Sequence, residues 1–487
     1  MRTLLGLAVC ALAASVALAA DVPVRGEALR LGASARNPER RGGLVRLQDV
    51  SIAAPFGDPR VDGATLVVHG GSSADQCFVR ADLPAARWAP IRGDGARRGW
   101  RYRDRTGAAS GVRRVLVRAG RVSVVAKGGA WPCGLKQPER VPVSVILALG
   151  DVRWCAAFGG TVAANGTGRF RARGAPAPAA CPDGDLTVAD LNVLHGLTCP
   201  AGTDNCRFPE RAALLFRWVE AAGCPDVVAL QEVRATQVTI LVGTLPSLCG
   251  GAYEAVYDPL NRVDDAMLLT RIPVLDVEIV PLAGNFRNLL RARLDHPLGP
   301  VDVFTTHLAS SGDGALVPCA AADCPAACVE AGATTRRECQ GVQVAQMVEA
   351  RHDVATPAVI AGDFNEDPTS FVHAQFTTRG WADSYLAAGN PECDPTTGVG
   401  CTSGRVDDAL AQLESPASNE VERIDFIVVT PAAGCRIEPA GDPDGDGTAT
   451  ALFADRPNPF APACGPAPAP ICWPSDHVGA QLDLDCR

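Results

Sequence analysis

The spacing of apolar residues changes about one third of the way along the 487-residue chain. In the first part, short alternating or fully apolar runs are separated by glycine-rich turns, and these runs are 64–69, 115–117, 121–126 and 141–149. Alternation of this kind predicts strands with one buried face, and a succession of short strands predicts a β-sandwich or barrel. Because no convincing helical pattern occurs before residue 170, we expect a β-rich domain there.

Beyond residue 185, strand-like and helical patterns follow one another. Pro209 suits the first turn of a helix, and apolar residues between 214 and 222 fall on one face before Gly223 and Pro225 end it. A second helix is indicated by Val344, Met347 and Val348. The predicted strands are 186–193, 226–230, 301–306, 357–361 and 423–429. This half is therefore expected to be α/β or α+β.

A proline-, alanine- and glycine-rich segment, residues 171–184, joins the two patterns and is expected to be a linker. Residues 1–20 place Arg2 before an apolar stretch and end in small residues, as a secretory signal peptide does. The expected order is a signal peptide (1–20), a β-rich accessory domain (21–170), the linker (171–184) and a second domain (185–487). No later apolar run approaches the roughly 20 residues that cross a bilayer, so we expect a secreted protein, extracellular or periplasmic.

The cysteine count agrees with export. Of 19 cysteines, Cys10 lies in the signal peptide, and the remaining 18 could form nine disulfides in an oxidising compartment. The cluster of Cys319, Cys324, Cys328 and Cys339 could also be a zinc site, but it contains no histidine. Disulfides are the favoured interpretation, and their pairing cannot be deduced from the spacing.

Composition and charge narrow the protein class further. With 47% hydrophobic and 20% charged residues the chain is globular, which excludes a disordered or collagen-like protein. Residues 21–180 hold 26 cationic side chains against 12 carboxylates, whereas residues 181–487 hold 18 arginines against 42 carboxylates. An opposite charge in the two halves indicates different partners for each.

Polar residues that can bind metals or exchange protons recur where the predicted strands of the second half end. They are Asn192, Gln231 with Glu232, His307, Asp363 with Asn365, Asp425, and Asp476 with His477. Taken singly, each has a structural explanation: a solvated strand end, a turn former or a helix cap. Taken together, carboxylates at several strand ends supply the hard oxygen ligands of a magnesium-like ion, and two histidines can transfer protons.

The order of these residues resembles the endonuclease/exonuclease/phosphatase superfamily over about residues 185–487. The resemblance rests on Gln231-Glu232, Gly362-Asp363-Phe364-Asn365 and Ser475-Asp476-His477 in this order. It implies an α+β fold, a four-layer sandwich of two stacked mixed β-sheets flanked by helices. It also implies a hydrolase that uses a divalent metal on phosphate esters.

The resemblance implies roles for individual residues. Glu232 and Asp476 match the metal ligands, while Asn192 and Arg287 match groups that contact the substrate phosphate. The catalytic positions are matched by His307, Asp363, Asn365, Asp425 and His477. Asp425 would orient His477, and either Asp363 or His477 would activate the water. The alternative for Arg287 is an exposed strand arginine. The loop after Asn192 departs from the N-x-D-G form of some family members, and His195 in this loop has no assigned role.

We therefore expect a secreted phosphoesterase that uses Mg²⁺ or Mn²⁺ to hydrolyse phosphodiesters, as a nuclease does. The substrate could be nucleic acid, a phospholipid or a small phosphoester. A phosphomonoesterase or a sphingomyelinase-like phospholipase C on the same fold is the alternative, and a catalytically inactive binding module is a weaker one. A cysteine-bearing insertion, residues 310–339, could border the substrate cleft. The sequence does not predict the oligomeric state.

Two further patterns can each be interpreted either as a ligand-binding site or as ordinary surface structure. Asp442, Asp444 and Asp446 alternate as in the first half of a calcium loop, but Phe453 stands where the loop needs a glutamate. A structural Ca²⁺ site and an acidic turn are both consistent with this. In the first domain, Arg101, Arg103 and Arg105 alternate with Trp100 and Tyr102 on a predicted strand. These arginines could bind a polyanion, form a solvated edge or dock on the acidic half.

Overall fold

The computed structural model describes residues 20–34, 37–70, 76–91, 93–139, 141–150, 152–179, 181, 185–258, 265–297, 299–321, 324–352, 356–405, 410–417, 420–432, 435–441 and 449–486. The predicted signal peptide, apart from Ala20, and the calcium-loop residues Asp442, Asp444 and Asp446 lie outside these ranges. The described chain forms two compact units, unit 1 up to Cys181 and unit 2 from Asp185. Within the described part, no helix is both long and apolar enough to span a membrane.

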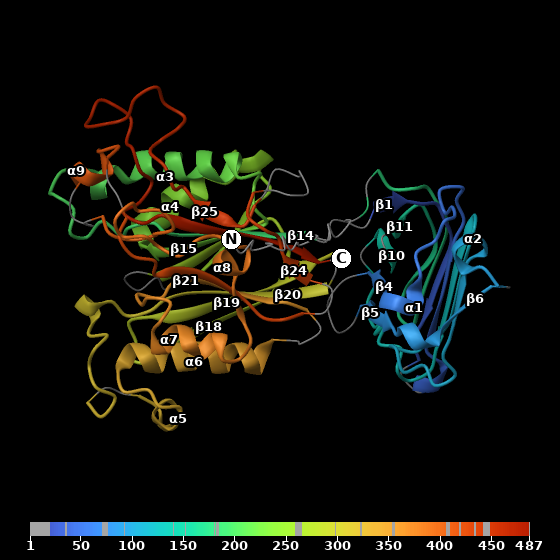
Figure 1. The fold of residues 1–487 in the computed structure, drawn as a ribbon. Helices are drawn as coiled ribbons and strands as arrows, with labels where there is room; N and C mark the ends of the chain where they lie inside the picture. The colour runs from blue at the N-terminus through green and yellow to red at the C-terminus, as the bar shows by residue number, and fades with distance from the viewer. Residues whose placement is uncertain are drawn as a thin grey trace, which may run out of the picture. The chain divides into compact units, whose positions relative to one another are not determined.

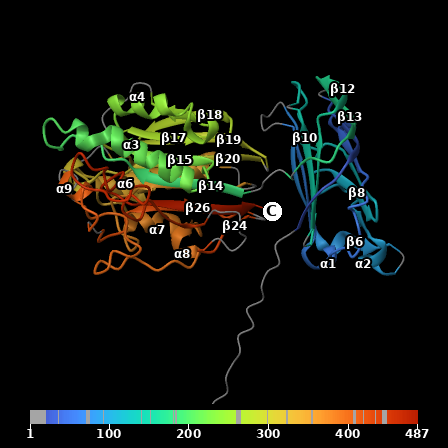
Figure 2. The ribbon, with the colours of Figure 1, turned by 90° about the horizontal axis from the view of Figure 1, so that it is seen from above.

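Unit 1 is a sandwich of two β-sheets (Figure 2). The five-stranded sheet has the order β1 (Ala20–Pro23), β11 (Val152–Phe158), β10 (Val143–Leu149), β4 (Ala64–His69), β5 (Phe78–Leu83). The eight-stranded sheet has the order β12 (Thr161–Gly166), β13 (Arg169–Ala175), β2 (Gly26–Gly32), β3 (Gly42–Leu47), β9 (Arg121–Lys127), β8 (Val112–Arg118), β7 (Trp100–Arg103), β6 (Trp88–Pro90). Their facing sides bury one apolar core that includes Trp100, Trp131 and Trp154. The β-rich architecture expected for this part of the chain is thus present.

Two details of unit 1 differ from the sequence analysis. Single helical turns occur at α1 (Pro59–Asp62) and α2 (Gly95–Arg98), where Asp58 and Asp94 cap the first backbone N–H groups. A four-residue turn is too short to give a helical period, so it escaped the analysis. Strand β13 also continues to Ala175, into the segment expected to be a linker. Its buried positions alternate with arginines and end in alanines, which gives only a weak apolar signal.

Unit 2 has four layers, with two mixed sheets packed face to face between helices (Figure 1). The first sheet has the order β16 (Glu254–Tyr257), β17 (Asp265–Thr270), β15 (Val227–Val233), β14 (Asp185–Asn192), β26 (Gly479–Cys486), β24 (Cys435–Ile437), with β25 (Ala451–Phe453) also paired to β26. The second has the order β18 (Val274–Pro281), β19 (Asn288–His296), β20 (Gly299–His307), β21 (Ala358–Asp363), β23 (Asp425–Val429), β22 (Ala382–Asp383). The α+β sandwich expected from the resemblance is confirmed.

The two helices predicted for unit 2, one after Pro209 and one around Val344 and Val348, are present. Two helices that were not predicted join them on the outer faces of the sheets. Helices α3 (Asp204–Ala221) and α4 (Ala235–Thr244) cover the first sheet, and α6 (Arg336–Arg351) and α7 (Phe371–Thr377) cover the second (Figure 1). Thr335 and Glu338 form a reciprocal capping box at the start of α6. Shorter helices are α5 (Ala326–Glu330), α8 (Ser384–Ala387) and α9 (Leu410–Leu413).

All 18 cysteines beyond Cys10 form disulfides. The pairs are Cys77–Cys133, Cys155–Cys181, Cys199–Cys206, Cys224–Cys249, Cys319–Cys324, Cys328–Cys339, Cys393–Cys401, Cys435–Cys486 and Cys464–Cys472. The four cysteines that could have formed a zinc site are therefore paired with one another, which confirms the disulfide interpretation.

Candidate active site

Six strands of unit 2 bring their functional residues to one edge of the two packed sheets. Parallel pairing places Asn192 of β14 opposite Gln231 of β15, and His307 of β20 opposite Asp363 of β21. Antiparallel pairing places Asp425, the first residue of β23, opposite Asp363. Asp476 and His477 directly precede β26, which is antiparallel to β14. The two sheets touch through β14 with β21 and β15 with β20, so the site forms where they meet.

A close approach of backbones explains the glycine in Gly362-Asp363-Phe364-Asn365. A Cβ atom at Gly362 would lie 2.0 Å from the carbonyl oxygen of Thr306 on the neighbouring parallel strand. No side chain fits there, so glycine lets β20 and β21 pair up to their ends. His307 and Asp363 are thereby held side by side.

Asn192 bridges the two sheets. Its Nδ2 donates to Glu232 Oε1 over 3.0 Å and to Asp363 Oδ2 over 3.1 Å. The backbone N–H of Leu194 donates to Asn192 Oδ1 over 3.0 Å, which fixes the orientation of the amide. The bridge thus couples a carboxylate of the first sheet to one of the second.

Glu232 lies at an irregular point of β15. The register between β15 and β17 shifts between Leu230 and Val233, and Glu232 has a φ of 62°. Such left-handed backbone is uncommon for a residue with a side chain and points to a constrained site. The N–H of His195 donates to Glu232 Oε2 over 2.8 Å. Burial raises the pKa of Glu232, but the charge and N–H of His195 together with Asn192 bring it below its usual value.

Asp363, Asp425 and His477 form a buried group whose carboxylate and imidazole ligand atoms all lie within 4.8 Å of one another. His477 Nδ1 lies 2.9 Å from Asp425 Oδ2, and His477 Nε2 lies 3.9 Å from Asp363 Oδ2. Burial and the charge of Asp425 raise the pKa of Asp363 to about 7. Burial disfavours a charged His477, yet Asp425, Asp476 and Asp363 outweigh it and hold the pKa of His477 well above its usual value.

His307 is held as a neutral ring. Arg287 Nη1 lies 2.9 Å from His307 Nδ1, and since a guanidinium only donates, Nδ1 accepts and the proton resides on Nε2. That Nε2–H lies 3.5 Å from Asp363 Oδ2. The Asn365 amide nitrogen, 2.9 Å from the same Nε2, is itself a donor and donates to the carbonyl oxygen of Leu308. Burial and Arg287 keep the pKa of His307 well below its usual value.

Arg287 differs from an exposed strand arginine. Its side chain is buried, and besides His307 it forms an ion pair with Asp313 in the insertion. These contacts place Arg287 behind His307, where it orients the imidazole. Direct contact of Arg287 with a substrate phosphate stays a prediction.

Asp476 is linked to the backbone of Asn192 through Ser475. The Ser475 hydroxyl lies 3.0 Å from Asp476 Oδ1 and within hydrogen-bonding distance of the Asn192 carbonyl oxygen. Burial raises the pKa of Asp476, and the nearby charge of Glu232 raises it further. The structure thus leaves the two predicted metal ligands repelling each other in a buried setting. A divalent cation held by hard carboxylate oxygens would relieve this repulsion, so the donor set fits Mg²⁺ or Mn²⁺.

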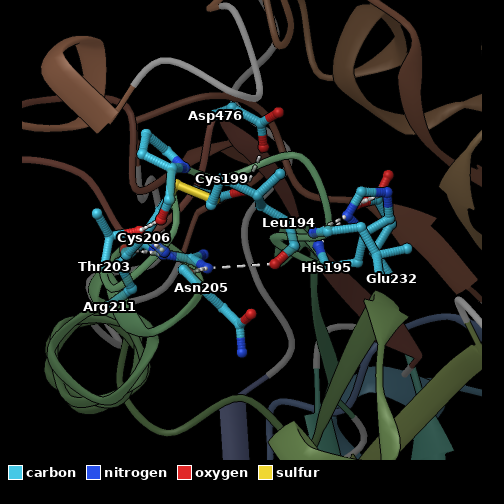
Figure 3. Close-up of a disulfide and its surroundings, with 12 residues drawn as sticks. Leu194, His195, Cys199, Thr203, Asn205, Cys206, Arg211, Glu232 and Asp476 are labelled. Atoms are coloured by element: carbon cyan, nitrogen blue, oxygen red, sulfur yellow. Dashed lines mark hydrogen bonds and ion pairs between the residues drawn. A yellow bond between two sulfur atoms is a disulfide. The ribbon is translucent and has the colours of Figure 1, made fainter.

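Arg211 was not predicted and fixes three segments around the site. Its guanidinium donates to the carbonyl oxygens of Val193, Leu194, Asn205, Cys206 and Pro474. The Cys199–Cys206 disulfide closes the loop that Arg211 binds, between His195 and α3 (Figure 3). Burial lowers the pKa of Arg211 to about 10, with Asp476 and Glu232 acting in the opposite direction. A signal existed, because Arg211 lies three, four and seven residues before Leu214, Leu215 and Trp218, on the apolar face of the predicted helix.

Asp190 and Thr305, which the sequence analysis did not single out, hold the side chain of Gln231. Gln231 Nε2 donates to Asp190 Oδ1 over 2.7 Å and to Thr305 Oγ1 over 3.0 Å. Asp190 is fully buried, and burial followed by the charge of Asp425 keeps its pKa well above the usual value. Asp190 shares a strand face with Asn192, which was the available signal.

Comparison with known proteins identifies the family of unit 2. The model of the Endonuclease/Exonuclease/phosphatase family matches residues 191–477. A solved structure of D. rerio TDP2 complexed with single-strand DNA product is 18% identical, covers 62% of this chain and 99% of that chain, and gives a TM-score of 0.41. The mannosyl-6-phosphatase of Bacteroides thetaiotaomicron VPI-5482 is 17% identical, with 61% and 99% covered and a TM-score of 0.43. A search of curated proteins finds no significant match. Since the family match spans more than half of the sequence, the chain belongs to the Endonuclease/Exonuclease/phosphatase family.

Proposed function

We propose that unit 2 is a divalent-metal-dependent phosphoesterase that hydrolyses phosphodiesters, and that the protein is exported. The observation that carries the catalytic proposal is the environment of Asp363 Oδ2. Asn192 Nδ2, His307 Nε2 and His477 Nε2 approach this one oxygen from three different strand ends, at 3.1, 3.5 and 3.9 Å. Nine disulfides support the export proposal, since such density is typical of oxidising compartments.

Glu232 and Asp476 would hold the metal ion. When bound, a divalent ion neutralises the nonbridging oxygens of a phosphodiester and so reduces their repulsion of a nucleophile. Asn192 would keep Glu232 in place through its 3.0 Å hydrogen bond. Arg211 would do the same for the segments that carry His195 and Asp476, because it donates to the carbonyls of Leu194 and Pro474.

Asp363 is the better candidate for the base that takes a proton from the attacking water. A group with a pKa of about 7 is partly ionised at neutral pH, whereas His477, with a raised pKa, already carries its proton. His477 would therefore place positive charge beside the phosphorus centre and donate its proton to the departing oxygen. Asp425 would hold its ring orientation, and the Nε2–H of His307 would donate to a phosphate oxygen.

Three phosphate esters are candidate substrates. Hydrolysis of nucleic acid is the leading proposal, and a phosphomonoester or a sphingomyelin-like phospholipid is the alternative. The 42 carboxylates of residues 181–487 oppose tight binding of a long polyanion by this unit alone. Selection of substrate would thus depend on the local cleft and on contacts outside it.

A substrate panel tests the proposal. Plasmid DNA, a phosphoinositide and sphingomyelin are incubated with the wild-type protein and Mg²⁺, with chelator, and with the His477→Ala variant. We expect phosphate-ester cleavage that chelator and His477→Ala both abolish. Cleavage that survives both changes would contradict the mechanism.

A further inference from the structure

The outer face of the eight-stranded sheet in unit 1 carries cations in register across the strands. One row crosses the sheet in the order Arg171, Arg30, Leu44, Val125, Arg114, Arg103. The buried neighbours along each strand, such as Phe170, Leu29 and Tyr102, belong to the core of unit 1. Alternation therefore turns the whole row outward.

Two flanking rows extend this array. On one side, Arg173, Arg46 and Arg101 lie in one row, and on the other side Arg169 and Lys127 lie in the other. We call the nine cations of the three rows the arginine face. Along β13, its arginines recur at every second residue, roughly 6.6 Å apart, so the charges form a two-dimensional array.

The charges of the arginine face are almost uncompensated. Of its nine cations, Arg46 alone has an ion pair with a described residue, Glu27, at 3.6 Å. Arg171 lies directly opposite Arg30, and Arg114 directly opposite Arg103. Like charges in such cross-strand pairs destabilise a sheet. A face that only needed to be soluble would mix both signs, so this arrangement fits an external anion.

A groove lies at one end of the arginine face. It has a volume of about 550 Å³, and six cations line it, Arg30, Arg40, Arg41, Lys127, Arg169 and Arg171, with no carboxylate among the lining residues. Gly32 and Gly42 stand between Arg169 and Lys127 in the register, and both line the groove. The Nε of Arg41 is buried and has no hydrogen-bond partner in the described structure.

We propose that the arginine face binds the phosphate backbone of a nucleic acid duplex. Eight of its nine cations are arginine, whose planar fork matches phosphate oxygens better than the point charge of lysine. A repeating array fits a repeating anion, and the charges of a duplex form such a series. The binding is independent of base sequence, since backbone contacts carry no sequence information.

The composition of the arginine face argues against two other anions. Its uncharged row members are small or aliphatic and at most half-buried, such as Leu44, Leu116 and Val125, and none is aromatic. Single-stranded nucleic acid is held mainly by stacking on aromatic side chains. Membrane-bound surfaces add exposed aromatic or bulky apolar anchors to their basic residues. Neither feature occurs in these rows.

The proposal goes beyond the hydrolytic site and does not depend on it. A duplex-binding unit 1 would supply the attraction that the acidic unit 2 lacks. Binding is measured in chelator, where a metal-dependent hydrolase is inactive, so loss of binding and loss of catalysis are separate results.

Fluorescence anisotropy of a short labelled DNA duplex with the full chain in chelator tests the proposal. The variant Arg30→Gln/Arg171→Gln removes two charges from the arginine face. The matched control Arg97→Gln/Arg98→Gln removes two exposed charges from α2, which does not belong to the three rows. We expect the face variant to bind about tenfold more weakly at about 0.1 M salt and the slope of log K against log salt to fall by about 2. The control should bind as the wild-type protein does.

Several outcomes would overturn this assignment. One is equal weakening in the face variant and the control, which would mean net charge alone matters. A second is failure of the wild-type protein to bind duplex, which docking of the acidic unit on this face would cause. A third is tighter binding of heparin, single-stranded DNA or acidic phospholipid vesicles than of duplex. Thermal melting checks folding, and the face variant should melt no lower than the wild-type protein because it loses a like-charge pair.

Discussion

The Nδ1 of His477 lies 2.9 Å from Oδ2 of Asp425, and both side chains are buried. This pairing fixes which ring nitrogen faces Asp363 and keeps His477 protonated. Asp425 is the first residue of β23, and His477 lies in the loop before β26. The two residues belong to different sheets, so their pairing depends on how the sheets pack.

Replacing Asp425 by asparagine should lower kcat about 10²- to 10⁴-fold, because the amide no longer stabilises the imidazolium. The pKa of His477 should fall. Since the protonated ring is the active form in the proposed mechanism, activity would be lost at a lower pH than in the wild-type protein. A pH–rate profile measures this shift of the alkaline limb.

The buried His373–Asp383 pair, with Nε2 and Oδ2 3.3 Å apart, provides a matched control in the same unit. His373→Gln should leave the pH–rate profile unchanged even if it lowers the melting temperature. An unshifted alkaline limb in Asp425→Asn would rule out the proposed role of this pair.

Removing one charge from the predicted metal ligands should separate metal binding from stability. In Asp476→Asn, repulsion between the two carboxylates disappears, so the melting temperature in chelator should stay the same or rise. In Glu232→Gln it should fall, because the surroundings of Glu232 favour its charged form. The stabilisation by Mg²⁺ or Mn²⁺, about 2.7 kcal/mol at a hundredfold excess over Kd, should be lost. Differential scanning calorimetry with and without metal measures both. If the variants retain the full metal-induced shift, the ion is held elsewhere.

Arg211 should be a major stabilising residue of unit 2. Arg211→Met would leave several buried carbonyl oxygens without a donor, and we expect it to lower the free energy of unfolding of unit 2 by about 3 kcal/mol. Urea titration followed by tryptophan fluorescence measures the loss. Arg217→Met, six residues further along α3 and exposed, is the control, and we expect it to lower the free energy of unfolding by less than about 1 kcal/mol. If both variants lose the same free energy of unfolding, the proposed stabilising role of Arg211 is wrong.

Glu139 should make the stability of unit 1 depend on pH. Burial raises its pKa to about 7, although the N–H of Cys77 donates to Oε2 over 2.9 Å. Because the folded pKa lies above the unfolded value of 4.5, the protonated group favours folding, and this stability is lost as the pH rises from about 4.5 to about 7. Glu139→Gln should therefore stabilise unit 1 at pH 8 by about 1 kcal/mol, after allowance for solvent screening. Melting curves at pH 5 and pH 8 would show no difference between variant and wild-type if Glu139 were ionised throughout.

Local patterns were sufficient for several strands and helices of the fold and for many of the polar residues at their ends. Strand β21 and helix α6, for example, are short-range features whose apolar run or helical period can be read from consecutive residues. The structure also brings Asn192, Glu232, His307, Asp363, Asp425 and His477 together at one edge of the sheets. Their ordered appearance along the chain predicted the site, but not the distances within it.

Tertiary structure alone decided which groups support that site and how its protons are placed. Arg211 reaches the carbonyl oxygen of Pro474, 263 residues away, and Arg287, which directly precedes β19, donates to Nδ1 of His307. The arginine face likewise emerges only from strand register, since Arg30 and Arg171 are far apart in sequence yet directly opposite in the sheet. Alternation and helical period are set by the few nearest residues, whereas burial, like-charge pairing and pKa depend on which distant segments the fold brings into contact.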